Sequence, residues 1–263
     1  MRGRRGPAAA GPQPRTAVFR FYAELNDFLP PARRQQAFDC PFHGAPRLRS
    51  AVAALGVPPP EVDLVLVNGA PASWERRLAD GDRVAVYPVF ESFDIAPLAR
   101  LRPQPLRRSR FVLDVHLGRL ARALRLLGLD TRWANDLEDD AIIALARAEA
   151  RIILTRDRRL LASPAVTHGY WVRATARDAQ VAEVLARFDL GGQLAPFTRC
   201  LSCNGALAQA AKAEVADRLP PGTRQTYEAF WRCGGCGKTY WQGAHWGRLT
   251  AMAARWSAGN RTP

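Results

Sequence analysis

The chain has 263 residues, of which 48% are hydrophobic and 24% charged, so it is long enough for two or three domains and too hydrophobic for an intrinsically disordered chain. Its 38 basic and 24 acidic side chains give a formal net charge of +14, which favours a polyanion such as nucleic acid as partner. All but two of the basic residues are arginine, a bias that the base composition of a genome can also produce.

The ends of the chain and its apolar runs bear on its compartment. No run approaches the roughly 20 apolar residues of a membrane helix, so we expect a cytoplasmic protein that does not bind a membrane. Residues 1–15 lack the apolar segment of a secretory signal and are rich in Arg, Pro and Gly, so a disordered tail is expected there. A second tail is expected at 251–263.

The block 16–92 has the pattern of a β-grasp, ubiquitin-like domain. The expected order is strand 17–22, strand 37–42, helix 48–55, strand 64–67 and strand 83–87. The segments VLVNGAPA and LADGDRVAVYPVF resemble the small sulfur-carrier proteins of thiamin and molybdopterin synthesis. Those carriers act through a free C-terminal Gly-Gly, whereas this chain continues beyond Phe90, so we expect the domain to bind a protein partner instead.

A linker is expected at 93–109, and the block that follows it is the least basic part of the chain. The net charge is +6 over residues 1–108, +2 over 109–195 and +6 over 196–263. Acidic side chains therefore collect between two basic flanks.

The expected elements of the block 110–192 indicate a parallel α/β sheet. A strand at 110–113 precedes a helix that ends at Gly128, and a helix over 141–150 with Asp139 as its N-cap precedes a strand at 152–154. In the first helix, leucines at 117, 120, 124 and 127 mark the buried face, and the exposed side is expected to carry Arg119, Arg122 and Arg125.

Three acids are expected at one edge of this sheet. Asp114 and Asp157 each follow a strand, and the carboxyl ends of parallel strands open into one crevice, which Asp139 or Asp140 can also reach. Clustered carboxylates repel one another unless a cation lies among them, and oxygen ligands suit Mg²⁺ or Mn²⁺. Such an ion could position water for phosphodiester cleavage. The alternative is structural: Asp139 caps a helix, and Asp157 pairs with a neighbouring arginine on a surface turn.

The segment FVLDVHLGRLARALRLLGLDTRWANDLEDDAIIALARAEARIILTRDRRLL at 111–161 closely resembles the Mut-seven C-terminal RNase family, a branch of the PIN-like nucleases. The resemblance continues through VRATARDAQ at 172–180 into the cysteine region, and a β-grasp domain in front is a known arrangement in that family. It implies that Asp114, Asp157 and one acid of the run 136–140 bind the catalytic metal. From Asp136, Asp139 and Asp140 we select Asp139, and Asp178 is the nearest candidate for a fourth acid. We expect the substrate to be bound by Arg119, Arg156 and Arg158.

Four cysteines have the spacing of a zinc ribbon, which is expected over 196–250. Cys200 and Cys203 form one CxxC pair, and Cys233 and Cys236 form a second pair after an intervening 29 residues. Four thiolates would fill a tetrahedral Zn²⁺, so the zinc is expected to be structural. Cys40 stands apart and is expected to be a buried thiol. The aromatic residues nearby, Trp231, Tyr240, Trp241 and Trp246, fit equally well as a base-stacking surface or as the small domain's core.

The function favoured by these patterns is a metal-dependent ribonuclease that hydrolyses phosphodiester bonds of single-stranded RNA. The alternative is a non-catalytic RNA-binding adaptor that uses the ribbon and the β-grasp domain as docking surfaces. An aspartate-nucleophile phosphatase is disfavoured, because that chemistry requires a second acid two positions after the nucleophile, where this chain has His116.

Overall fold

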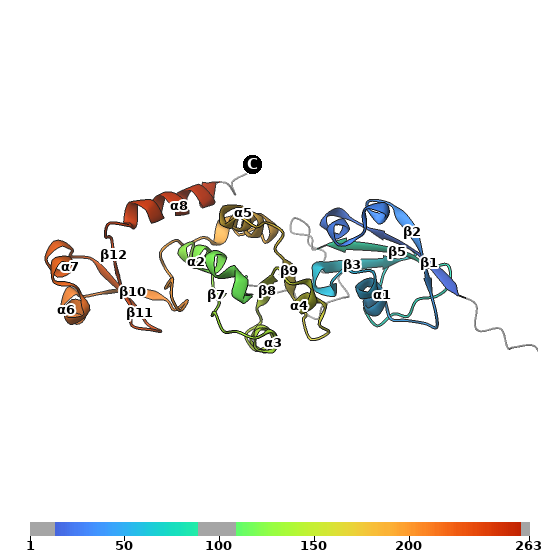
Figure 1. Cartoon of the computed structure of the whole chain (residues 1–263), viewed down its shortest axis with the longest axis horizontal. Helices are drawn as coiled ribbons and strands as arrows, with labels where there is room; N and C mark the ends of the chain where they lie inside the picture. Colours follow the sequence, from blue (N-terminus) through green and yellow to red (C-terminus); the bar gives the residue numbers. More distant parts are fainter. Residues whose placement is uncertain (1–13, 89–108, 259–263) are drawn as a thin grey trace, which may run out of the picture. The chain divides into compact units, whose positions relative to one another are not determined.

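A computed structural model of the chain describes residues 14–88 and 109–258, which form two compact units, one on each side of the gap (Figure 1). The expected linker, except Ser109, and most of the expected N-terminal tail lie outside the described residues. Within those residues, no helix is both long and apolar enough to cross a membrane.

The first unit is a five-stranded mixed sheet in the order β2-β1-β5-β3-β4. The central strands β1 and β5 run parallel and their other neighbours run antiparallel, which is the β-grasp arrangement predicted from the sequence. The core lies on one face of the sheet, where Phe19, Phe21 and Val86 are fully buried together with Val52 of α1. The elements are β1 (Arg15–Phe21), η1 (Ala23–Phe28), η2 (Pro31–Arg33), β2 (Ala37–Phe42), α1 (Leu48–Ala54), η3 (Pro59–Glu61), β3 (Val62–Val67), β4 (Ala70–Pro71) and β5 (Arg83–Pro88).

The second unit contains the predicted parallel sheet, whose strand order is β7-β6-β8-β9. Two of its strands follow the predicted apolar runs, and β7 and β9 are two to three residues long and were not expected. The elements are β6 (Phe111–Leu113), η4 (Val115–Leu117), α2 (Gly118–Leu126), β7 (Thr131–Arg132), α3 (Asp139–Ala148), β8 (Ile152–Thr155), α4 (Arg158–Ala162), β9 (Gly169–Trp171) and α5 (Arg177–Arg187).

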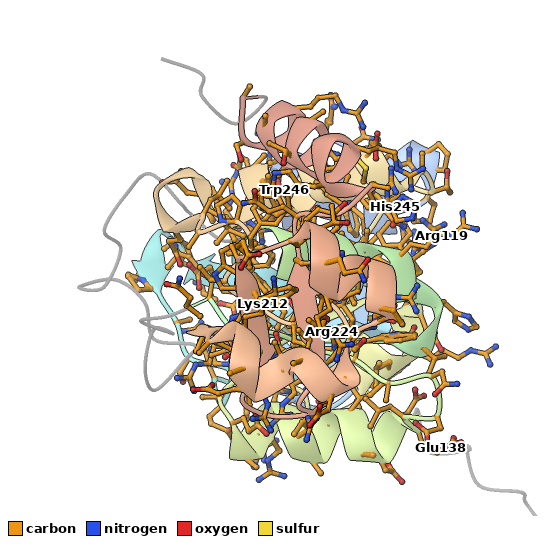
Figure 2. All side chains as sticks on the ribbon, turned by 90° about the vertical axis from the view of Figure 1, so that its left-hand side faces the viewer. Arg119, Glu138, Lys212, Arg224, His245 and Trp246 are labelled. Atoms are coloured by element: carbon orange, nitrogen blue, oxygen red, sulfur yellow. The ribbon has the colours of Figure 1, made fainter. Side chains whose placement is uncertain are left out.

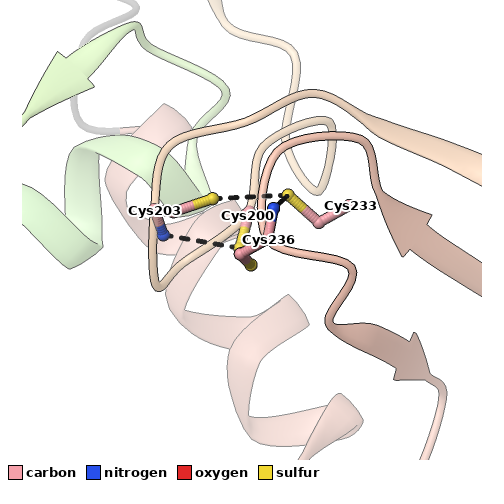
Figure 3. A group of neighbouring side chains, drawn as sticks. All are labelled: Cys200, Cys203, Cys233 and Cys236. Carbon is pink, nitrogen blue, oxygen red and sulfur yellow. Dashed lines mark hydrogen bonds between the residues drawn. The ribbon is translucent and has the colours of Figure 1, made fainter.

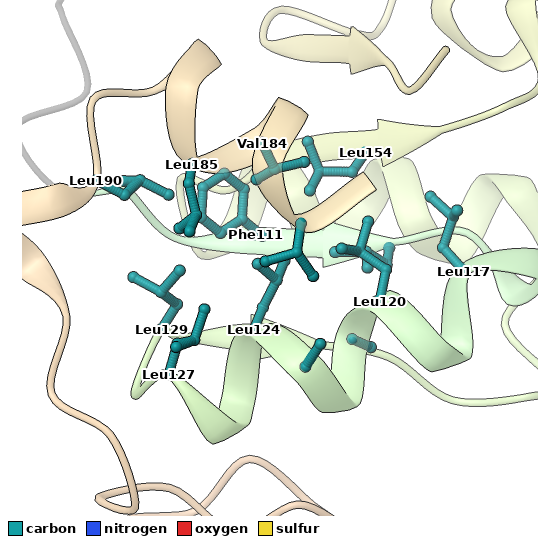
Figure 4. Close-up of a cluster of buried hydrophobic side chains, with 14 of the residues drawn as sticks. Phe111, Leu117, Leu120, Leu124, Leu127, Leu129, Leu154, Val184, Leu185 and Leu190 are labelled. Atoms are coloured by element: carbon teal, nitrogen blue, oxygen red, sulfur yellow. The ribbon is translucent and has the colours of Figure 1, made fainter. Parts of the chain in front are cut away.

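Alternation along the strands divides the helices between the two faces of this sheet. Phe111 and Leu154 pack against the leucines of α2 and the apolar side of α5 (Figure 4). Val112 and Ile153 point to the opposite face and pack against α3 and α4. Successive residues of a strand point to opposite faces, so a side chain that follows β6 or β8 can be assigned to a face by its position.

The C-terminal part of the second unit is a three-stranded antiparallel sheet in the order β10-β11-β12, followed by a long helix. Up to residue 258, where the described residues end, the tail expected at 251–263 is instead the second half of that helix, and its Ala253 and Trp256 are buried in the same core as Phe111. The elements are η5 (Gly191–Gln193), β10 (Leu207–Ala210), α6 (Lys212–Val215), η6 (Ala216–Arg218), α7 (Pro221–Thr226), β11 (Phe230–Cys233), β12 (Thr239–Trp241) and α8 (Trp246–Ala258).

Gly128, which ends α2 as expected, cannot be replaced without strain. Its φ of +87° is in the left-handed region, and an added Cβ would lie 2.1 Å from the carbonyl oxygen of Ala195. We expect Gly128→Ala to lower the free energy of unfolding by at least about 2 kcal/mol, measured by chemical unfolding. Gly192→Ala is the matched control, because a Cβ there meets nothing within 4 Å. Equal stabilities of the two variants would contradict this prediction.

Candidate functional site

Asp114 lies at the carboxyl end of the central strand β6. Its side chain is 5% exposed and makes two hydrogen bonds. Oδ1 accepts from the backbone N–H of His116 at 3.3 Å, which caps η4, and Oδ2 accepts from the hydroxyl of Thr155 at 2.7 Å. Because Asp114 follows Val112 by two positions, its side chain lies on the sheet face that α3 and α4 cover.

Asp157 follows the neighbouring strand β8 and caps the short helix α4. Its Oδ1 accepts from the backbone N–H of Arg159 at 2.7 Å, and its own backbone N–H donates to Thr155 Oγ1 at 2.8 Å. The Thr155 hydroxyl therefore donates to Asp114 and accepts from Asp157 at the same time. Thr155 was not among the candidate residues, although its place directly after a buried strand and two residues before an acid was a usable signal.

Asp139 is the first residue of α3 and faces the same cluster. Burial raises its pKa above the ordinary value, and the negative charges of Asp157 and Asp114 raise it further. The predicted N-cap role is wrong: Glu138 occupies the N-cap position, and no side chain there accepts a hydrogen bond. The alternative reading of Asp139 as a capping residue is therefore not supported.

The three carboxylates are near enough at one edge of the sheet to interact electrostatically, but they are less tightly grouped than the cysteines described below. In the part of the chain that the structure describes, only the four cysteines form a group of at least three potential ligand atoms that all lie within 4.8 Å of one another. Mutual repulsion of the carboxylates opposes a closer approach. The raised pKa of Asp139 is the electrostatic sign that the three charges are close enough to interact.

Asp139→Asn is expected to make the metal-free protein slightly more stable at neutral pH. The pKa of Asp139 is higher in the folded chain than in the unfolded chain, so ionisation of this group opposes folding. The cost is fully present above the folded pKa and vanishes below the unfolded value, near 3.8. We expect the variant to raise Tm by at most about 2 °C at pH 7 and by nothing at pH 3. Thermal unfolding without divalent metal at both pH values tests this, and a lower Tm at pH 7 would contradict it.

The three candidate arginines lie in different settings. Arg119 is exposed on α2 (Figure 2). Glu138, which precedes α3, is exposed as well (Figure 2). Arg156 uses its guanidinium to donate to the backbone carbonyls of Arg173, at 3.0 Å, and of Ala174. Arg158 lies over the indole of Trp171, with its Cζ 3.8 Å from the ring centroid. Arg156 thus fixes the loop after β9, while Arg158 is held over an aromatic face beside Asp157.

Asp178, the candidate fourth acid, serves a different purpose. Its carboxylate pairs with Arg255 of α8 at 2.5 Å and with Arg177 at 2.9 Å. The pair with Arg255 connects the start of α5 to the C-terminal helix, whereas Arg177 belongs to α5 itself. Glu183 of α5 is the acid that supports the end of β9. Its carboxylate accepts hydrogen bonds from the Tyr170 hydroxyl and from the backbone N–H groups of Arg173 and Ala174.

The four cysteines form a compact cluster between two turns (Figure 3). Sγ of Cys203 lies 3.4 Å from Sγ of Cys233, and Sγ of Cys200 lies 3.7 Å from Sγ of Cys236. Burial raises the pKa of Cys200, but hydrogen bonds from Tyr240 and from backbone N–H groups bring it down to about 6. Burial and the neighbouring thiols raise the pKa of Cys203. Four sulfur donors at this spacing are compatible with a structural zinc and leave no open position for a substrate. Cys40, outside this cluster, is half-buried rather than fully buried.

The first cysteine turn is docked onto the helix α2 through Arg125. This residue was expected on the exposed side of α2, but it is 1% exposed. Its guanidinium donates to the carbonyls of Leu201 and Ser202, which lie between the first two cysteines. It also donates to the carbonyls of Thr131 and Trp133. A buried cation is tolerated here because four carbonyl oxygens receive its N–H groups.

A second contact reinforces this docking. Asn204, directly after Cys203, accepts from the backbone N–H of Thr131 at 2.9 Å and donates to Asp130 at 2.7 Å. Asp130 also pairs with Arg151, at 2.7 Å, and with Arg199, at 3.3 Å. The cysteine turn and the loop after α2 therefore form one polar network, which joins the expected ribbon to the expected RNase domain in a single unit.

Some aromatic residues of the ribbon belong to cores. Trp241 and Tyr227 pack against the buried Phe230, and Trp246 packs against Phe197 with ring centroids 4.3 Å apart. Tyr240 lies 3.1 Å, through its hydroxyl, from Sγ of Cys200. The structure thus supports the core interpretation for Trp241, whereas Trp231, Tyr240 and Trp246 are half-buried and fit either interpretation.

Comparisons with known proteins find a matching family model for each of the two units. Residues 109–253 match the family model described as the Mut7-C RNAse domain, and residues 15–94 match the model described as Mut7-C ubiquitin. The human protein described as an exonuclease mut-7 homolog is 27% identical, in a match that covers 55% of this chain and 26% of that protein. The chain thus spans about a quarter of the length of this curated relative. No solved structure matches the chain.

Proposed function

The chain belongs to the Mut7-C RNase family, and from this premise we propose that it is a metal-dependent ribonuclease that hydrolyses phosphodiester bonds of single-stranded RNA. The observation that carries the proposal is the hydroxyl of Thr155, which ties Asp114 to the backbone of Asp157 at the edge where Asp139 also lies. Family membership supports a nuclease in general, and the carboxylate arrangement supports this particular chemistry.

The proposed catalytic metal is Mg²⁺ or Mn²⁺, held by Asp114, Asp139 and Asp157. Carboxylate oxygens are the ligands that these hard cations prefer, and a positive ion would relieve the repulsion that raises the pKa of Asp139. When bound, such an ion supplies charge that activates water and stabilises the leaving oxygen of a phosphodiester. Thr155 holds the Asp114 carboxylate in one orientation, and the N–H of Arg159 does the same for Asp157.

The proposed substrate contacts come from Arg119, Arg156 and Arg158. Arg158 lies over the indole of Trp171 at the start of α4, directly after Asp157, and in this proposal its guanidinium binds a phosphate next to the one that is cleaved. We also propose that Zn²⁺ is held by the cysteine cluster and supports the fold without taking part in catalysis. In this proposal the ubiquitin-like domain binds a protein partner.

The test is cleavage of a labelled single-stranded RNA by the purified full chain, with its zinc content verified. We expect fragments with added Mn²⁺ or Mg²⁺ and none when the divalent metal is left out. Omission is preferred to a chelator, because a chelator would also remove zinc from the cysteines. Salt-sensitive RNA binding without cleavage under either metal would overturn the proposal in favour of a non-catalytic adaptor.

A further inference from the structure

Trp171 ends the strand β9, level with Thr155 of the neighbouring strand β8. The parallel register pairs Thr155 with Trp171 and Ile153 with Gly169. Because residues in register point to the same face, Trp171 lies on the face of Thr155 and packs against the cluster of Val112 and Ile153. The indole therefore lies one strand away from the hydroxyl that joins Asp114 to Asp157.

The orientation of this indole is fixed from two directions. Its Nε1 donates to the backbone carbonyl of Arg156 at 3.3 Å. Its strand end is supported by Arg173, whose guanidinium donates to the carbonyl of Trp171 at 2.9 Å and lies 5.2 Å from the indole centroid. Trp171 is half-buried, so one part of the ring is packed and another part is available to the arginine above it.

Arg158 lies over this ring, with its Cζ 3.8 Å from the centroid. Stacking uses the flat face of the guanidinium and not its edge, where the five N–H donors point outward in the plane. A stacked arginine thus keeps the geometry that binds a phosphate through two N–H groups, while the ring restricts the rotation of its long side chain. Less rotational entropy is then lost when the phosphate binds.

The neighbouring arginine is differently engaged. Arg156 donates through Nη1 to the carbonyls of Arg173 and Ala174 and thereby holds the loop after β9. Arg158 adjoins Asp157 in sequence and begins α4, whose start lies at the acidic edge. Its position at the start of α4, directly after Asp157, makes Arg158 the arginine that we expect to contact the phosphate nearest to the proposed cleavage position.

We propose that Trp171 is a positioning residue that holds Arg158 for binding one backbone phosphate of RNA beside the acidic cluster. This inference rests on the proposed function, which supplies RNA as the substrate. Trp171 acts on the substrate only through Arg158. In this proposal Trp171 does not contact the reacting atoms. Its effect is on the phosphate contact and hence on binding.

The experiment measures the affinity of the full chain for single-stranded RNA over a range of salt concentrations, without divalent metal. Each lost phosphate contact reduces the slope of log affinity against log salt by about 0.7 for a single strand. We expect this reduction, with about 5- to 10-fold weaker binding at low salt, in Arg158→Gln and also in Trp171→Leu. Trp171→Phe, which retains an aromatic face, should keep a slope close to that of the unchanged protein. The double variant Arg158→Gln, Trp171→Leu should be no weaker than Arg158→Gln.

Arg147→Gln is the matched control, because it removes the same charge near the end of α3 that is remote from the acidic edge, and its slope should not change. Under cleavage conditions, Trp171→Leu should raise KM about 5- to 10-fold and leave kcat within about twofold. An unchanged slope in Trp171→Leu, or additive losses in the double variant, would overturn the inference. If the variants show the expected salt slopes but the unchanged protein cleaves no RNA with any divalent metal, the proposed ribonuclease function is rejected and the phosphate contact is supported.

Discussion

An Asp114→Asn variant is expected to lose RNA cleavage by about 100- to 1,000-fold or more while it keeps its fold. Asparagine has almost the same shape. Its amide oxygen can still accept the hydrogen bond that the Thr155 hydroxyl donates to Asp114 Oδ2 at an O–O distance of 2.7 Å. What the variant loses is the negative charge of a residue that is only 5% exposed and that interacts electrostatically with Asp139. That charge is the property by which a divalent cation is held in the proposed mechanism.

The measurement is the rate of cleavage with Mn²⁺ present, together with thermal unfolding and RNA affinity for each variant. Asp157→Asn is expected to behave like Asp114→Asn. Asp136→Asn and Asp140→Asn are matched controls, because they remove the same charge on either side of Asp139, the acid whose pKa the charges of Asp157 and Asp114 raise. We expect their rates to stay within about threefold of the unchanged protein. Asp139→Asn should fall with the inactive group. Full activity of Asp114→Asn would reject the proposed site.

The positions of Asp114 and Asp157 at the sheet edge could be predicted, because each acid directly follows an apolar run in the sequence and all parallel sheets bring such strand ends together. An apolar run followed by an acid occurs at Asp114 and at Asp157, and parallel strands bring such positions together. The same reasoning gave the wrong cap for α3, since a run of acids from Asp136 to Asp140 offers several starting points within one turn. Helix boundaries in such a run depend on backbone geometry that composition does not specify.

Arg125 shows what could not be predicted. Helical spacing places it beside Arg122 on the polar side of α2, and nothing in the neighbouring residues distinguishes the two. Its burial depends on the carbonyls of Leu201 and Ser202, which lie 76 and 77 positions later in the chain. Long-range acceptors of this kind are invisible to a pattern read along one helix. The buried half of α8 was missed for the same reason, because it packs against α5, which lies far earlier in the chain.

The loss of one cysteine of the cluster is expected to have the largest effect on stability. Cys236 is the best position for this test, since its side chain is exposed and its replacement removes little packing. Structural Zn²⁺ contributes about 10–16 kcal/mol of apparent binding free energy in small zinc peptides at pH 7. We therefore expect Cys236→Ser to lower the zinc content below one ion per chain and to lower Tm by at least about 10 °C.

This loss should extend beyond the ribbon because the cysteine turn is part of the polar network around Arg125. If the turn loosens, the buried guanidinium loses the acceptors at Leu201 and Ser202, and Asn204 no longer holds the loop at Thr131. Trp133 lies in that loop region and donates to the carbonyl of Val115, the residue after Asp114. Zinc loss is thus expected to reduce RNA cleavage as well as stability.

Cys40→Ser is the matched control for this prediction. It makes the same chemical change at a half-buried cysteine of the first unit, outside the four-cysteine cluster. Zinc content measured by mass spectrometry and Tm measured by calorimetry should both be unchanged in Cys40→Ser. Equal zinc content and equal Tm in the two variants would contradict a structural metal at the cluster. A fall in Tm with full cleavage activity at low temperature would instead limit the role of zinc to the ribbon and reject its coupling to Asp114 through Arg125 and Trp133.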